Sequence, residues 1–396
     1  MKLLSLLLVL SASSVFAEGL TVSSDFPGGS GEVTTIDREN RLIVINPADH
    51  PGKGWRCWWY VRIENPLPGE SFLLDVGEAP WATPDRCSLS TDDGATWHAG
   101  PEGTRDGKRI RYRIQADQRT VRVAWGPPFL PSDARRLVEA IASGTTSANA
   151  FELCRTREGH ATPALRIGPE AKDTTEGRPL VWVQARQHAW ESGSSWVAKG
   201  FTEWLVSDAP RARRIRDNCE VVIVPVMDID NVRRGAGGKN QVPQDHNRDW
   251  SEDPHWHAVR AAQRELSSAA EEGRLAVFID LHNPGATNRF TYFYVPPRDT
   301  LVPEARTRLD SFLQAAAHEL RGPLRFTGKT IESGSQYDPK AWRRMSKNWV
   351  AALGTPAVAV TLEVPWNTRA STTQGYETTG SQLGRTIERY LRDLEG

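Results

Sequence analysis

The chain has 396 residues, which exceeds the roughly 100–200 residues of a typical domain and predicts two domains or one large one. Its 49 Lys and Arg residues balance 49 Asp and Glu residues, so the formal net charge is zero. A nucleic-acid-binding protein or a polybasic membrane-surface protein would carry a clear basic excess, so the balance argues against both classes. With 25% charged and 39% hydrophobic residues, the composition excludes a disordered tail and a polytopic membrane protein.

The first seventeen residues have the pattern of a secretory signal peptide. The charged start Met1-Lys2 is followed by the apolar run Leu3–Leu10, and the segment closes on Val15-Phe16-Ala17. The apolar run is too short to cross a bilayer, which needs roughly 20 apolar residues. A buried N-terminal strand and an uncleaved anchor are the alternatives. We expect residues 1–17 to direct export to a secreted or periplasmic location, with no membrane contact after their removal.

Export would make the cysteines relevant, because disulfides form in oxidising compartments. The four cysteines, which permit three pairings, are Cys57, Cys87, Cys154 and Cys219. Pairing the first with the second and the third with the fourth would keep each bridge within one half of the chain. Four buried thiols are the alternative. None has Cys-x-x-Cys spacing, which argues against a thiolate metal site.

Short strand-like runs fill the chain from about residue 20 to residue 125. They are rich in β-branched and aromatic residues and are separated by Pro-Gly and Asp-Gly turn signals. The runs are 42–45, 58–63, 71–76 and 119–124. Such spacing predicts an antiparallel β-sandwich domain over residues 18–130. The Arg and Lys residues between 105 and 122 alternate with other residues, as expected for a solvated strand face rather than a binding patch.

Beyond the stiff Pro-rich connector 126–131, Ser132-Asp133 is a candidate N-cap for a helix that continues to Ile141. From about residue 153 onward, strand patterns alternate with helical ones. The predicted strands are 180–185, 221–226, 276–281, 291–295 and 357–362, and the predicted helices are 196–207, 255–270, 302–320 and 382–394. This alternation predicts an α/β fold over residues 131–396, with a mixed, largely parallel sheet flanked by helices.

Polar motifs follow several of these strands, where ligands bind in open α/β sheets. His188 and Glu191 come directly after the strand 180–185, and a spacing of three can turn both toward one cation. Two His and one Glu form a known catalytic zinc set. His282, at the end of the strand 276–281, could supply the third ligand. Taken singly, each motif is also compatible with an ordinary polar loop.

Two further motifs supply groups that could act on a substrate. In the segment 245–250, Arg248 offers a planar fork for a carboxylate, and Asn247 can bind the same ligand. Glu363 ends the hydrophobic run 360–364. Burying a carboxylate there costs free energy, which a catalytic role would explain, so Glu363 is a candidate general base.

Together and in this order, the four motifs resemble the zinc metallocarboxypeptidase family. The family pattern is His-x-x-Glu, then Asp-x-Asn-Arg, then a lone His after a strand, then a late Glu, and the resemblance covers roughly residues 150–396. The segments 58–63 and 125–129 resemble the N-terminal sandwich of the cytosolic-carboxypeptidase-like branch. The best match is a secreted, bacterial-type member of that branch.

The resemblance implies one zinc ion per chain, held by His188, Glu191 and His282. Glu363 would take a proton from the metal-activated water and return it to the leaving amine. Asp245 would be the acid that orients the first zinc histidine.

The resemblance also implies the substrate. Asn247 and Arg248 would bind the terminal carboxylate of a peptide or peptide-like molecule, whose C-terminal amide bond is then hydrolysed. An amidase or deacylase acting on a cell-wall or other non-peptide amide is the alternative within enzymes. A non-catalytic binding protein is the alternative outside them, although retention of all three ligand types argues against it.

Three departures from the family pattern stand out. Ala189-Trp190 occupies the interior of the His-x-x-Glu motif, where the family often has Pro-Gly. An oxyanion-stabilising cation is expected before residue 245. Arg233, Arg234 and Lys239 are candidates, and we take Arg234 for this role. Tyr337 is the nearest match to the tyrosine that the family carries upstream of its catalytic Glu.

Overall fold

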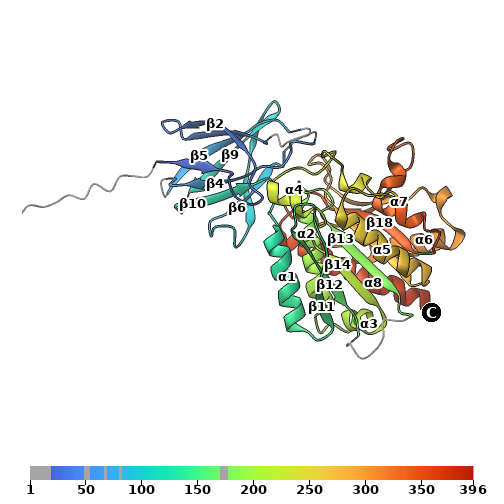
Figure 1. Cartoon of the computed structure of the whole chain (residues 1–396). Coiled ribbons are helices and arrows are strands. Elements are labelled where there is room, and N and C mark those ends of the chain that lie inside the picture. Colours follow the sequence, from blue (N-terminus) through green and yellow to red (C-terminus); the bar gives the residue numbers. More distant parts are fainter. Residues whose placement is uncertain are drawn as a thin grey trace, which may run out of the picture.

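The computed structural model describes residues 19–48, 54–66, 69–79, 83–116, 118–169 and 177–395. The predicted signal peptide at residues 1–17 and the Pro51-Gly52 turn lie outside the described residues. Two regions follow one another along the chain, a set of β-sheets up to residue 124 and an α/β region from residue 131 (Figure 1).

Two five-stranded sheets form the N-terminal region. Their strands are β1 (Thr21–Ser23), β2 (Glu32–Asp37), β3 (Leu42–Asn46), β4 (Tyr60–Glu64), β5 (Glu70–Val76), β6 (Arg86–Ser90), β7 (His98–Glu102), β8 (Thr104–Asp106), β9 (Arg109–Ala116) and β10 (Thr120–Ala124). The strand orders are β1-β4-β10-β6-β7 and β2-β3-β5-β9-β8, and the pairs are antiparallel except β3 with β5. Along β9, Ile110, Tyr112 and Ile114 are buried while Arg111 and Arg113 are exposed. The predicted solvated basic face is therefore present on this strand.

The α/β region is built on one eight-stranded sheet. Its elements are α1 (Pro131–Gly144), β11 (Ala148–Arg155), β12 (Ala161–Ile167), β13 (Leu180–Ala185), α2 (Ser192–Leu205), α3 (Pro210–Asn218), β14 (Glu220–Val224), α4 (Ile229–Arg234), α5 (His257–Glu271), β15 (Leu275–His282), β16 (Thr291–Val295), α6 (Pro303–Glu319), β17 (Phe326–Glu332), α7 (Ser346–Ala351), β18 (Val358–Glu363) and α8 (Thr373–Glu395). The strand order is β11-β12-β14-β13-β15-β18-β16-β17, and the four central strands are parallel. The predicted mixed sheet is confirmed.

Helices cover both faces of this sheet because its central strands are apolar on both sides. Val181 and Val183 of β13 share a core with α2, α6 and α8, including Phe201 and Ile387. Trp182, between the two valines, shares a second core with α5 on the opposite face. None of the helices among the described residues is long and apolar enough to cross a membrane.

Some local predictions are wrong. The first helix of the α/β region has its N-cap at Leu130 and begins at Pro131, rather than being capped by Ser132-Asp133. Proline suits the first helical position because its φ is fixed and it lacks an N–H group that would be left unpaired there. The Asp133 carboxylate instead accepts the N–H of Leu130 at 2.6 Å. The last helix begins at Thr373, nine residues before the predicted start at 382.

The two regions meet at loops that follow the central strands. Trp125, from the connector, packs edge-on against Trp190 and Trp366, which follow β13 and β18, with ring centroids 5.5 and 6.3 Å away. The Arg289 guanidinium pairs with the Asp85 carboxylate at 2.7 Å. No disulfide joins the four cysteines. The sandwich thus rests on the loops where the sequence places its polar motifs.

Candidate functional site

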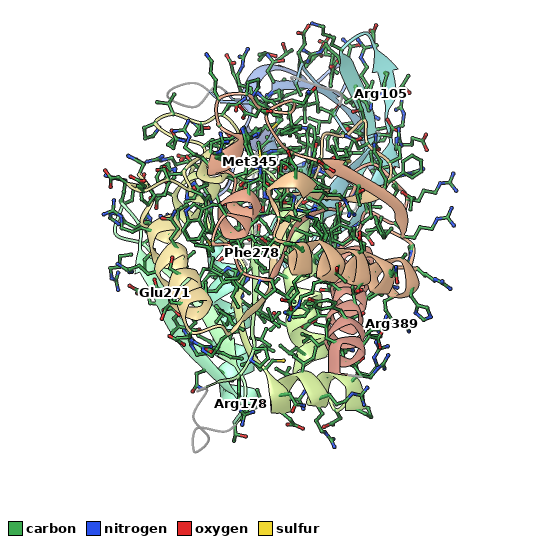
Figure 2. The ribbon with its side chains drawn as sticks, turned by 90° about the vertical axis from the view of Figure 1, so that its right-hand side faces the viewer. Arg105, Arg178, Glu271, Phe278, Met345 and Arg389 are labelled. Atoms are coloured by element: carbon green, nitrogen blue, oxygen red, sulfur yellow. The ribbon has the colours of Figure 1, made fainter. Side chains whose placement is uncertain are left out.

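The carboxyl ends of the central strands meet at one end of the α/β region. Because β15 and β18 are parallel and in register, His282 and Glu363 are direct neighbours across the sheet. Arg178, just before β13, lies at the far end of the molecule in Figure 2, whereas Met345 lies on the side of the N-terminal sheets. The predicted residues that follow β13, β15 and β18 therefore share the end that faces the sandwich.

His188, Glu191 and His282 come together as one buried cluster. The Nδ1 atom of His188 is 2.8 Å from Oε1 of Glu191, and the Nδ1 atom of His282 is 2.7 Å from Oε2. The imidazole ring centroids are 4.8 Å apart, and one ligand atom from each residue lies within 4.8 Å of the others. Two imidazole nitrogens facing one carboxylate are a donor set that fits a zinc ion.

The outer nitrogen of each histidine is also engaged. Nε2 of His188 lies 3.2 Å from Oδ1 of Asp245, and Nε2 of His282 lies 2.9 Å from Oδ2 of Asp280. A carboxylate can only accept, so with a metal bound at each Nδ1 the proton of each ring would lie on Nε2 and be donated to Asp245 or Asp280. Asp245 is therefore placed against the first histidine, as predicted. Asp280 was not predicted.

The charges of this cluster shift one another strongly. Burial alone would raise the pKa of Glu191, but His188 and His282 outweigh it and lower the pKa to about 2. Burial would likewise raise the pKa of Asp245, yet Lys239 and His188 hold it well below its ordinary value. The two carboxylates are thus charged at neutral pH, as metal binding and histidine orientation require.

Glu363 lines the cavity beside the cluster and differs from these carboxylates. It is 8% exposed, and its Oε2 atom has no hydrogen-bond partner among the described residues. Burial raises its pKa to about 8, with a further upward contribution from Glu191 that His282 opposes. A proton on this carboxyl group is therefore held more strongly than on an ordinary glutamate.

The cavity that joins these groups has a volume of about 290 Å³. Its lining includes His188, Glu191, Asn247, Arg248, His282, Glu363, Tyr337, Lys239, Lys347, Thr361 and Trp55. Nε of Arg248 donates to Oδ2 of Asp338 at 2.8 Å, which fixes the guanidinium at the wall. Asn247 Nδ2 lies 3.3 Å from Nε2 of His282. The structure thus brings the metal cluster, the predicted base and the predicted carboxylate-binding pair into one cavity.

Arg234 is not brought to this cavity. Its guanidinium pairs with Glu158 and with Asn231 at 3.4 Å, and its side chain is 47% exposed. Arg234 ends α4, and Gly235 follows in a left-handed conformation that turns the chain before Lys239. Lys239 does line the cavity, with Nζ 3.5 Å from Oδ2 of Asp245. Of the three candidate cations, Lys239 lines this cavity, and Arg233 and Arg234 do not.

Tyr337 lies at the rim. It lines the cavity but is 46% exposed, and its ring is 5.2 Å from that of Tyr294. Trp55, from the N-terminal region, lines the cavity too. Its backbone N–H donates to the backbone carbonyl of Lys239 at 3.1 Å. The sandwich therefore contributes directly to the wall of the site.

Lys347 is a cavity residue that the sequence analysis missed. It is the second residue of α7, and its side chain is buried, with 2% exposed. Its Nζ atom lies 3.9 Å from Met345 Sδ and 5.6 Å from the centroid of the Tyr294 ring. Burial, with a smaller contribution from Arg248, lowers its pKa to about 7. No motif in the sequence marks this lysine, because its neighbours in the cavity come from distant segments.

Fold and site define an α/β protein with a buried two-His, one-Glu metal centre at its strand ends. Residues 139–392 match the family model described as zinc carboxypeptidase, so the chain belongs to that family. The predicted resemblance is confirmed, and zinc is the metal of the family.

Human cytosolic carboxypeptidase 1 is 34% identical over 308 residues, which are 66% of this chain and 25% of the human protein. Cytosolic carboxypeptidase 2 of Danio rerio is 24% identical over 265 residues, 58% of this chain and 36% of that protein. The chain thus spans about a third or less of the length of these two relatives.

Solved structures share the fold across both regions. A metallo-carboxypeptidase from Burkholderia cenocepacia aligns with a TM-score of 0.81 at 19% identity, covering 95% of this chain and 99% of the other. A metallo-carboxypeptidase from Pseudomonas aeruginosa, solved in complex with (2-guanidinoethylmercapto)succinic acid, gives 0.76 at 19% identity, covering 94% and 100%.

Proposed function

We propose that this protein is a zinc-dependent carboxypeptidase that hydrolyses the C-terminal amide bond of a peptide or peptide-like substrate. One observation carries the proposal: a single cavity holds the buried cluster of His188, Glu191 and His282 together with Glu363 and Arg248. A metal-binding group, a proton acceptor and a carboxylate-binding cation are the parts that such hydrolysis needs.

Zinc held by the cluster would polarise the scissile carbonyl and lower the pKa of a bound water to near 7. Glu363 then takes the proton as the water oxygen bonds to the carbonyl carbon. It delivers that proton to the amide nitrogen as the C–N bond breaks, so a carboxylate and an amine leave. The raised pKa of Glu363 makes it, once ionised, a stronger proton acceptor than an ordinary glutamate.

Arg248 and Asn247 select the C-terminal end of the substrate peptide. Because Asp338 holds the Arg248 guanidinium against the cavity wall, its planar fork is ready for a terminal carboxylate. A peptide without that carboxylate would give up a charge-assisted contact with this guanidinium, so substrates with a free C-terminus are favoured.

Lys239 takes the oxyanion role that the sequence analysis gave to Arg234. Its ammonium lies in the cavity between Asp245 and the Trp55 ring, whose centroid is 5.8 Å away. A fixed positive charge near the reacting carbonyl stabilises the oxygen on which negative charge develops. Tyr337, at the rim, would contact the substrate beside it.

Lys347 and Thr361 point to an acidic C-terminal side chain. The Lys347 ammonium is buried with no carboxylate in hydrogen-bond contact among the described residues, and the Thr361 hydroxyl is buried without a partner there. A buried cation and a buried hydroxyl are both costly unless a ligand satisfies them. A side-chain carboxylate on the substrate's last residue would satisfy both.

The test is hydrolysis of matched peptides that end in Glu, Leu or Lys, each with a free or an amidated C-terminus. We expect zinc-containing protein to cleave the free Glu peptide, a chelator to abolish cleavage, and the amidated peptides to resist. Arg248→Gln should remove this discrimination and Arg343→Gln, an exposed control, should not. Equal cleavage of amidated peptides would overturn the carboxypeptidase assignment in favour of an amidase.

Export is part of the proposal and is tested separately. The signal-like pattern of residues 1–17 predicts that the mature protein begins after Ala17. N-terminal sequencing of protein recovered from outside the cytoplasm should give Glu18 as the first residue. An intact Met1 on cytoplasmic protein would contradict it.

A further inference from the structure

A fully buried carboxylate lies behind the second histidine of the cluster. Asp280 precedes His282 by two residues on β15, so both side chains project to the same face of the sheet. Its Oδ2 atom accepts from Gln187 Nε2 at 2.5 Å and Ser346 Oγ at 2.6 Å, and lies 2.9 Å from His282 Nε2. Its Oδ1 atom accepts from Gln184 Nε2 at 3.3 Å. Donors from three segments thus hold the carboxylate in one orientation.

A second group competes for the same imidazole nitrogen. Nδ2 of Asn247 lies 3.3 Å from Nε2 of His282. The Asn247 amide cannot turn freely, because its Oδ1 atom accepts the backbone N–H of Ser346 at 2.9 Å. Its donor side therefore faces the histidine, and it would favour a ring with a lone pair on Nε2.

The two neighbours demand opposite tautomers. Asp280 can only accept, so it favours a proton on Nε2, whereas Asn247 favours the proton on Nδ1. Nδ1 is the atom that faces Glu191, at 2.7 Å from Oε2. A proton on Nδ1 would block metal binding there, and only the tautomer favoured by Asp280 leaves that nitrogen available.

We propose that Asp280 is a positioning residue that holds His282 with its proton on Nε2 and thereby overrides Asn247, so that Nδ1 can bind the metal. This inference rests on the metal role proposed for His282. It assigns Asp280 no contact with the substrate or with the reacting atoms, and its effect is on metal affinity before any reaction.

The experiment measures zinc affinity of the full chain by competition with a chromophoric chelator, without any substrate. Asp280→Leu removes the acceptor and should weaken zinc binding by about 10–100-fold. Ser346→Ala removes a different contact of the same carboxylate and should leave the zinc affinity nearly unchanged. Placing Asn247→Asp in the Asp280→Leu background supplies a new acceptor beside Nε2 and should recover much of the loss.

A further variant does not require the substitution of Asp280 to be tolerated. Asn247→Ala removes the competing donor together with the Oδ1 acceptor of the Ser346 N–H, and zinc should still bind as tightly as in the unmodified protein or more tightly. Zinc affinity unaffected by Asp280→Leu, or weakened tenfold by Asn247→Ala, would overturn the inference. Failure of the unmodified protein to bind zinc would instead overturn the proposed function.

Discussion

The N-terminal sheets and the α/β region both bury carboxylates, but they treat them differently. In the sandwich, Asp75 is 4% exposed and is held by two guanidinium groups, Arg109 Nε at 2.6 Å and Arg111 Nε at 2.8 Å. In the α/β region, Glu363 is 8% exposed and one of its oxygens has no partner among the described residues. A buried carboxylate that is paired supports the structure, whereas a buried carboxyl group with an unpartnered oxygen is a cost that a function must explain.

The largest test of this contrast substitutes the two carboxylates in parallel. Glu363→Gln should lower kcat by about 10²–10⁴-fold, because the amide cannot accept the water proton. Zinc content should not change, since Glu363 is outside the ligand cluster. Asp75→Asn should leave kcat intact, whatever it does to thermal stability. Steady-state kinetics and metal analysis of both variants test this expectation. A Glu363→Gln protein with undiminished activity would show that Glu363 is not the general base.

The next comparison sets the two candidate oxyanion cations against each other. Lys239→Met should reduce kcat by about 10²–10³-fold, because it removes a fixed positive charge from the cavity. Arg234→Met, on the adjoining helix α4, should cost little activity because its guanidinium pairs with Glu158 outside the cavity. Kinetics of the two variants give the answer, and the reverse order of effects would restore Arg234.

A third comparison concerns the substrate side chain. Lys347→Met should reduce the preference for a C-terminal Glu over a C-terminal Leu by about 10–100-fold in kcat/KM, the size expected when one hydrogen bond to a charged group is lost. Activity on the Leu peptide should change far less. Equal losses on both peptides would show that Lys347 supports the cavity without reading the side chain.

The same lysine predicts a pH dependence. Burial, Arg248 and Lys239 together lower the pKa of Lys347 to about 7, with Asp280 and Glu363 opposing them. A lysine with a lowered pKa is charged below that value and neutral above it. The preference for acidic over apolar C-termini should therefore be strongest below about pH 7 and decline above it. The ratio of the two kcat/KM values across pH 5–9 tests this, and the slope should vanish in Lys347→Met.

The site was predictable from the sequence only where its residues follow strands. His188, His282 and Glu363 each come at or just after the end of a buried strand, so the sheet itself brings them together. Lys347 could not be found this way, because its place depends on how α7 packs against the cavity. Trp55 could not be found either, since it belongs to a different region from the rest of the lining.

The choice between Arg234 and Lys239 shows the same limit at shorter range. The two residues are five positions apart, Arg234 at the end of α4 and Lys239 in the loop that follows, and both offer a positive charge. Gly235, with a φ of 69°, ends α4 and redirects the chain, so that only the later cation reaches the cavity. The composition placed a cation in this segment, but the turn at Gly235 determines which one lies at the cavity.

The smallest expected effect comes from a charge that is neither buried nor near the site. Lys108 and Glu78 form an ion pair at 3.3 Å on the sandwich, with side chains 76% and 65% exposed. Lys108→Gln should change the free energy of unfolding by less than about 0.5 kcal/mol, because water already screens the pair. It should leave zinc affinity and kcat untouched. Denaturant unfolding of Lys108→Gln and of Lys347→Met compares the loss of an exposed lysine with the loss of a buried one. If Lys108→Gln and Lys347→Met had equally small effects on activity, the burial of a polar side chain without a carboxylate partner would no longer identify the functional residues of this protein.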